Sequence, residues 1–153
     1  MLNPTAAILI IGDEILSGRT RDSNMHYLSC ELTKIGIDLQ EARFIPDNAA
    51  KIIDDVRCLS SKYDYVFTSG GIGPTHDDIT ADCIAAAFET EISIREDAFN
   101  LLENYYSEQN IDFNSARQRM ARIPNGAKLI DNPISVAPGF HLHNVFVLSL
   151  IHI

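Results

Sequence analysis

Runs of apolar residues alternate with segments of helical periodicity along the chain. Residues 6–11 form an uninterrupted aliphatic run, Ala-Ala-Ile-Leu-Ile-Ile, which is typical of a strand that is buried on both faces. Met25, Leu28 and Leu32 then recur at helical spacing, and Gly36 ends this helix. The same patterns predict strands over residues 37–45, 63–68, 92–94, 128–130 and 145–148, and helices over 52–59, 79–88, 96–109 and 115–122.

The order of these elements predicts an α/β fold. Strands joined by helical crossovers run parallel with right-handed connections, so we expect a sheet that lies between layers of helices. The 153 residues fit one domain, and the sequence contains no internal repeat, linker or low-complexity stretch.

A glycine-rich loop, Thr-Ser-Gly-Gly-Ile-Gly-Pro-Thr-His-Asp-Asp-Ile-Thr, follows the third predicted strand. Gly70, Gly71 and Gly73 are expected to let backbone N–H groups close on an anion, towards which the next helix directs its positive end. Asp77 and Asp78 would repel a phosphate unless a divalent cation lay between them. The loop therefore predicts a site for a phosphorylated ligand with its metal, although glycines at these positions could also serve only the turn.

Carboxylates follow each of the first three predicted strands. Asp13 and Glu14 follow the first strand, Asp47 the second, and Asp77 and Asp78 the third. Because ligands bind beyond the carboxyl ends of parallel strands, these side chains are expected to converge on one edge of the fold. Such an arrangement suits Mg²⁺ held by one or two carboxylates and substrate phosphates.

Each of these residues also has a purely structural interpretation. Asp78 could cap the third helix and Asp47 or Asn48 the second, a role worth about 1 kcal/mol. Asp13 and Glu14 could be solvated turn residues.

Polar residues elsewhere offer weaker candidates for chemistry. Ser23 and Asn24 lie at a helix start and could bind phosphates or ribose hydroxyls, or could cap the helix. His76 in the glycine loop could contact substrate or transfer a proton. His141 and His143 fit a surface hairpin better than a zinc site. The sequence contains neither a GxSxG elbow nor a Walker A motif.

The overall charge argues against a nucleic-acid partner. The formal net charge is −9, and the nearest approach to a basic cluster is Arg117, Arg119 and Arg122 on one predicted helix. We find no signal peptide and no run of membrane-spanning length, so we expect no membrane partner. The 3 cysteines, without CxxC spacing, favour reduced thiols in a cytoplasmic protein.

Several motifs together resemble a known family. Residues 12–18, 22–24 and 68–80 resemble the MoaB/Mog molybdopterin-binding domain, closest to the N-terminal domain of CinA, the competence/damage-inducible protein, and residues 132–133 and 137–140 also match that branch. The resemblance implies a three-layer α/β sandwich with a mostly parallel central sheet, assembled as a homo-oligomer, either a dimer or a trimer.

The resemblance also implies roles for the site residues. Acidic residues of the family that match Asp47 and Asp78 serve the metal and the chemistry. Combined with the carboxylates at the strand ends, this gives Asp78, Asp47 and Asp77 as the expected catalytic residues, and Asp13, Asp47 and Asp78 as the expected ligands of a divalent metal, Mg²⁺ or Co²⁺. The expected phosphate-binding and substrate-binding residues are Gly70, Gly71, Gly73, Thr68, Ser69, Gly12, Asp13, Glu14, Ser23 and Asn24.

Three functions are compatible with this resemblance. The CinA-like branch implies a metal-dependent pyrophosphatase acting on ADP-ribose-like or FAD-like dinucleotides. The molybdenum-cofactor branch implies a molybdopterin adenylyltransferase that uses Mg-ATP. A third possibility is a module that binds molybdopterin or a nucleotide without turnover.

The C-terminal residues depart from the family pattern. The family continues through a Pro-Gly-Val-Pro-type loop into another helix, whereas this sequence ends Leu-Ser-Leu-Ile-His-Ile, which resembles the translation of a sequencing-library adapter. We therefore expect a C-terminally truncated domain over residues 1–147 and a non-native tail over 148–153. A genuine short variant is the alternative.

Overall fold

A mostly parallel sheet forms the centre of the molecule. The computed structural model describes residues 2–133 and 137–149, and within them six strands pair in the order β2-β1-β3-β8-β7-β6. The strands are β2 (Asp38–Ile45), β1 (Thr5–Ile11), β3 (Tyr65–Ser69), β8 (Val145–Leu148), β7 (Gly139–Leu142) and β6 (Lys128–Ile130). The pairs from β2 to β8 are parallel, whereas β7 pairs antiparallel with both β8 and β6. The predicted α/β fold class is confirmed.

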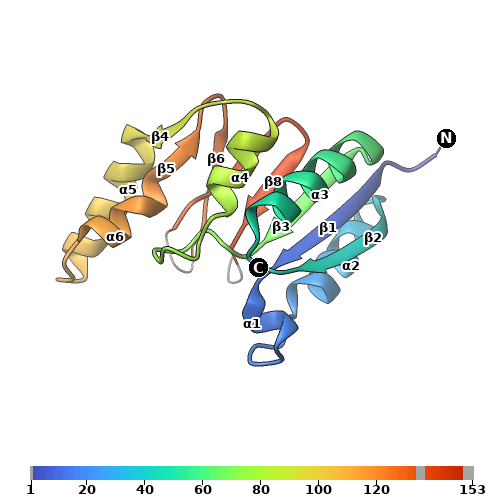
Figure 1. The fold of residues 1–153 in the computed structure, drawn as a ribbon, viewed down its shortest axis with the longest axis horizontal. Helices are drawn as coiled ribbons and strands as arrows, with labels where there is room; N and C mark the ends of the chain where they lie inside the picture. The colour runs from blue at the N-terminus through green and yellow to red at the C-terminus, as the bar shows by residue number, and fades with distance from the viewer. Residues whose placement is uncertain (1, 134–136, 150–153) are drawn as a thin grey trace.

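Helices cover both faces of this sheet (Figure 1). They are α2 (Asn24–Lys34) on one face, and α3 (Ala49–Lys62) and α4 (Thr80–Ala87) on the other. Ala7, Leu9 and Ile11 of β1 pack with α3 and α4, whereas Ile8 and Ile10 pack with α2. The uninterrupted aliphatic run is thus explained, because both faces of β1 are buried. No helix in the described ranges is long and apolar enough to cross a bilayer.

The second half of the chain adds a smaller unit beside the sheet (Figure 1). Its elements are β4 (Ile92–Ile94), α5 (Glu96–Glu108), α6 (Ser115–Gln118), the 3₁₀-helix η1 (Arg119–Ala121) and β5 (Arg122–Pro124). The predicted helix over 115–122 was wrong at its end, because Arg122 begins a strand that pairs antiparallel with β4. Pro124 disfavours helical backbone at the preceding residue, which helps to end the helix there.

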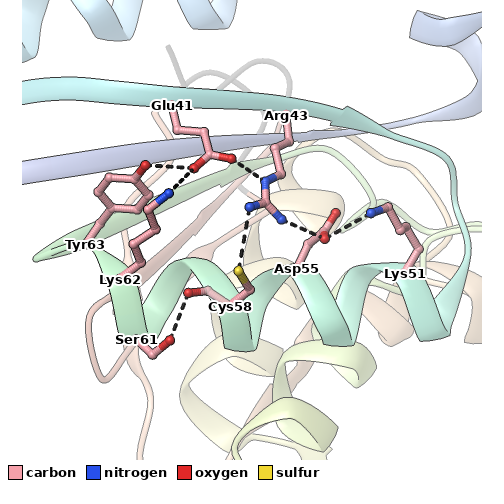
Figure 2. Close-up of polar contacts among 8 residues, drawn as sticks. All are labelled: Glu41, Arg43, Lys51, Asp55, Cys58, Ser61, Lys62 and Tyr63. Atoms are coloured by element: carbon pink, nitrogen blue, oxygen red, sulfur yellow. Dashed lines mark hydrogen bonds and ion pairs between the residues drawn. The ribbon is translucent and has the colours of Figure 1, made fainter.

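A bulge in β2 decides which of its side chains face α3. The pairing of β2 with β1 passes over Gln40. Residues on either side of such a bulge change face. Leu39 accordingly packs on the α2 side of the sheet, while Ile45 packs on the α3 side. Glu41 and Arg43 alternate with Ile45 and extend towards α3 (Figure 2).

A polar network then joins β2 to α3 (Figure 2). We call it the β2–α3 network; its members are Glu41, Arg43, Lys51, Asp55, Cys58, Lys62 and Tyr63. Arg43 donates to Glu41 Oε2 at 2.6 Å and to Asp55 Oδ1 at 2.9 Å. Hydrogen bonds from Arg43, and then from Tyr63, lower the pKa of Glu41 to about 2. Because the network holds α3 against the edge strand, it also positions the β2–α3 connection that carries Asp47.

Candidate functional site

The exits of the first three strands lie side by side, as the sequence predicted. In the register of the sheet, Ile11 is opposite Ile45, and Ile10 is opposite Ser69. The N–H group of Gly12 donates to the carbonyl of Ile45 at 3.0 Å, so the chain leaving β1 remains attached to the end of β2. The connections that carry the predicted site residues therefore begin from one edge of the sheet.

Asp13 and Asp47 bind each other across the first two strand exits. The backbone N–H of Asp13 donates to Asp47 Oδ2 at 3.1 Å, and the N–H of Asp47 donates to Asp13 Oδ1 at 3.1 Å. Burial raises the pKa of Asp47, and the negative charges of Asp13, Glu14 and Asp78 raise it further. We call these four residues the acidic cluster. Asp78 is therefore close enough for its charge to act on Asp47.

Asp78 folds back onto the glycine loop and does not cap α4. Its Oδ2 atom accepts from the N–H of Thr75 at 2.9 Å and from Thr75 Oγ1 at 2.8 Å. Within the described residues, the N-cap of α4 makes no side-chain hydrogen bond. The cap of α3 is Asn48, which accepts from the N–H of Lys51. Helix capping therefore accounts for Asn48 but not for Asp47 or Asp78.

The glycine loop packs so closely that two of its glycines are required. Gly70 and Gly71 have φ angles of 100° and 79°, which favour glycine. A Cβ at Gly70 would lie 2.2 Å from the carbonyl oxygen of Ile11, and one at Gly71 would lie 2.0 Å from Thr80 Oγ1. At Gly73, a Cβ would lie 2.9 Å from a carboxylate oxygen of Asp78. Close packing alone thus explains Gly70 and Gly71, while Gly73 leaves the backbone open beside the Asp78 carboxylate.

Two further predicted residues form a buried contact beneath the loop. Asn24 Nδ2, at the start of α2, donates to Ser69 Oγ at 2.6 Å. Ser23 is exposed, and α2 is instead capped by Asp22, which accepts from the N–H groups of the two residues that begin the helix. Thr68 is fully buried, and its hydroxyl has no hydrogen-bond partner in the described part of the chain. An unpaired buried hydroxyl calls for an explanation, such as a ligand.

The remaining predicted residues lie at the rim of the site. Asp77 and His76 contact each other at 3.4 Å, and their side chains are 76% and 87% exposed. Glu14 extends over Gly12, where an added Cβ would lie 2.6 Å from its carboxylate. His141 and His143 lie on and just after β7, in the β7–β8 hairpin, as expected.

The acidic residues do not form a complete metal cage by themselves. Among residues 2–133 and 137–149, no group of three or more His, Cys, Asp or Glu side chains is placed to hold a metal ion. Asp13, Asp47 and Asp78 nevertheless offer hard oxygen donors beside a glycine loop, which suits Mg²⁺ when substrate phosphates complete its coordination. The metal assignment thus stays a prediction.

A hollow on the other side of the glycine loop was not predicted from the sequence. It lies between Gly71, Gly73 and Asp78 on one side and Arg119 and Arg122 on the other. The small concentration of arginines on one predicted helix was the signal that could have indicated it, but no local pattern places that helix opposite the loop.

Comparisons with known proteins identify the family and the fold. The profile of a family described as "Probable molybdopterin binding domain" matches residues 7–150. The crystal structure of CinA from Thermoplasma acidophilum matches with a TM-score of 0.88 and 30% identity, covering 98% of this chain and 90% of that chain. MoaB from Pyrococcus furiosus, described as a tungsten cofactor synthesizing protein, shares the fold with a TM-score of 0.56 and 19% identity, covering 96% and 82%.

Curated relatives are longer than this chain. A "Probable FAD synthase" from Caenorhabditis elegans is 36% identical over 163 residues, covering 94% of this chain and 31% of that protein. The chain spans about half the length of several other curated relatives, for example 51% of one from Aeropyrum pernix, but only 34% of a "CinA-like protein" from Sulfurihydrogenibium. Of the tail expected over residues 148–153, Leu148 ends β8 and accepts from the N–H of Gly70 at 3.1 Å, whereas residues 150–153 lie outside the described ranges. The expected boundary at residue 147 stays a prediction.

Proposed function

The chain belongs to the family of molybdopterin-binding domains, in its CinA-like branch, and on that premise we propose that it binds a dinucleotide such as ADP-ribose or FAD with a divalent cation and hydrolyses its pyrophosphate. The observation that carries this proposal is the acidic cluster beside the glycine loop. These carboxylates repel one another beside a glycine-rich loop. A bound cation would remove this repulsion and join the carboxylates to an anionic ligand.

The residues divide into two groups in this proposal. The backbone of the loop at Gly71 and Gly73 would face the phosphates, whereas the N–H of Gly70 is already bonded to the carbonyl of Leu148 and the Thr68 hydroxyl is fully buried. Asp13, Asp47 and Asp78 hold the cation, Mg²⁺ or Co²⁺, which neutralises charge on the phosphates when it is bound. Asp78 and Asp47 are the proposed catalytic residues, and Asp77 joins them if its exposed side chain reaches the ligand.

The family match also supports a second candidate, because its description names a pterin. In that case the same residues would bind molybdopterin and transfer an adenylyl group from ATP to it, or would bind the pterin without turnover. Since the chain spans only part of its longer relatives, activity of the full-length proteins is a separate matter.

A substrate screen separates these candidates. The protein is incubated with ADP-ribose, with FAD, and with ATP plus molybdopterin, each with Mg²⁺ or Co²⁺, and products are resolved by chromatography. Release of AMP from ADP-ribose or FAD supports hydrolysis, adenylylated pterin supports transfer, and saturable binding without product supports a binding module. A mock purification from cells without the gene serves as the control for a contaminating enzyme, so AMP released equally by that preparation would not be assigned to this protein.

Two further predictions concern the state of the protein in the cell. We expect a homodimer or homotrimer, which light scattering of the purified protein would measure. We also expect a cytoplasmic location, which fractionation of the source cells would test.

A further inference from the structure

One arginine, Arg119, lines the hollow beside the glycine loop. Arg119 of η1 is half-buried and lines this hollow together with Gly71, Gly73 and Asp78. It also lines a second, more open hollow with Thr75 and residues next to it at the loop tip. Arg119 therefore borders the glycine loop at both hollows.

The three arginines of this region differ in how their charges are satisfied. Arg122 forms a two-point ion pair with Asp82 of α4, at 3.0 Å and 2.9 Å. Arg117 donates to the carbonyl of Asp112 at 2.6 Å and lies over the ring of Tyr106. Arg119 makes no side-chain hydrogen bond or ion pair within the described residues. It is thus the arginine beside the loop whose charge is free for a ligand.

We propose that Arg119 binds the second phosphate of a diphosphate ligand, while the loop backbone binds the first. This inference rests on the proposed function and goes beyond it by naming what selects a dinucleotide over a mononucleotide. A planar guanidinium presents paired donors that match two phosphate oxygens. Because Asp82 neutralises Arg122 and Asp78 lies on the loop side, Arg119 is the group that balances the additional negative charge of a second phosphate.

The two walls of this narrow hollow come from different parts of the fold. The loop wall belongs to the β3–α4 connection and the arginine wall to the smaller unit, so a diphosphate held between them would contact both parts of the fold. A monophosphate held by the loop would not need to reach the second wall. The effect of an Arg119 substitution on affinity should therefore be larger for the diphosphate ligand than for the monophosphate.

Calorimetric titration tests this assignment with two ligands in the presence of Mg²⁺. One is an ADP-ribose analogue with a methylene group in place of the oxygen between its phosphates, which cannot be hydrolysed there; the other is AMP. For Arg119→Ala we expect about 10-fold to 100-fold weaker binding of the analogue, the usual range for a charged hydrogen bond, and less than about 3-fold for AMP. Arg119→Lys keeps the charge but loses the paired donors, so it should fall between.

Arg117→Ala is the matched control, because it removes a neighbouring arginine that lines only the second hollow and already donates to the carbonyl of Asp112; its loss for the analogue should be smaller than that of Arg119→Ala. Equal losses for both ligands in Arg119→Ala, or no loss for the analogue, would overturn the role of Arg119 and leave the proposed function standing. Wild-type protein that binds neither ligand would overturn the proposed function, and this inference with it. Circular dichroism melts of each variant exclude unfolding as the cause.

Discussion

The carboxylates that pack along α3 and those that precede its first turn have opposite surroundings. Glu41 and Asp55 of the β2–α3 network face Arg43 and two lysines, and the pKa of Glu41 is lowered to about 2. In the acidic cluster before the first turn of α3, Asp47 lies instead among other carboxylates, and its pKa is raised. In the described ranges, no ion pair neutralises the carboxylate of Asp13, Asp47 or Asp78.

This contrast distinguishes carboxylates that hold the fold from carboxylates that await a ligand. A negative charge used for stability is best placed beside a cation, as in the β2–α3 network. Negative charges gathered without a cation reduce stability, so their presence at the exits of the central strands points to function.

The largest effect should come from breaking the acidic cluster at Asp78. We expect Asp78→Asn to lower AMP release by about 1,000-fold, within the range for a group that takes part directly in catalysis. Stability should fall by only about 1 kcal/mol, because one acceptor for Thr75 is weakened. Steady-state kinetics and urea unfolding measure the two effects. Asp77→Asn, at the neighbouring exposed position, shows whether Asp77 belongs to the catalytic set; full activity of Asp78→Asn would mean that this aspartate is structural.

Breaking the β2–α3 network should instead affect stability. Arg43→Ala leaves Asp55, which is 3% exposed, with Lys51 alone, and we expect the free energy of unfolding to fall by about 3 kcal/mol. Lys34→Ala is the control, because Lys34 and Glu31 form an exposed pair that should contribute less than about 0.5 kcal/mol. Equal losses in the two variants in urea unfolding would contradict the structural role of the network.

The contribution of Glu41 to the free energy of unfolding should depend on pH, which tests the same contrast. Its folded pKa of about 2 lies below the value of about 4.3 expected in the unfolded chain, so the unfolded state binds the proton more tightly. The stabilisation is therefore complete above about pH 5 and is lost as the pH falls towards 2. Glu41→Gln should unfold about 1 kcal/mol more easily at pH 7, and this difference should shrink on acidification. A constant difference across this range would exclude the ionised carboxylate as its source.

At Asp47 the pH dependence of stability has the opposite sign. Because its pKa is raised in the folded state, that state binds the proton more tightly, and the contribution of this group to stability falls as the pH rises from about 4 through the folded pKa. Asp47→Asn should therefore be about 0.5 kcal/mol more stable than wild type at pH 7, the usual cost of a like-charge pair, while losing activity. Added Mg²⁺ should raise the melting temperature of wild type more than that of the variant. A variant that is less stable at pH 7 and equally responsive to Mg²⁺ would contradict this account.

Much of the sheet, and the place where the strand exits meet, followed from local patterns. The aliphatic run of β1 indicated burial on both faces, and the glycine loop and the carboxylates after each strand indicated where the exits meet. These features are readable because periodicity and glycine spacing reflect the backbone conformation of one short segment. The strand over Arg122–Pro124 was missed, because its partner β4 lies far away in the sequence.

The sequence by itself determined the fold class, the family resemblance and the position of the acidic cluster on the exits of parallel strands. The tertiary structure alone decided that Asp13 and Asp47 bind each other across two strand exits, that Asn24 donates to Ser69, and that Arg119 lines a hollow beside the loop. These contacts depend on how whole segments pack against one another. Packing is settled by side-chain shapes and charges from distant parts of the chain, so no single stretch of sequence contains it.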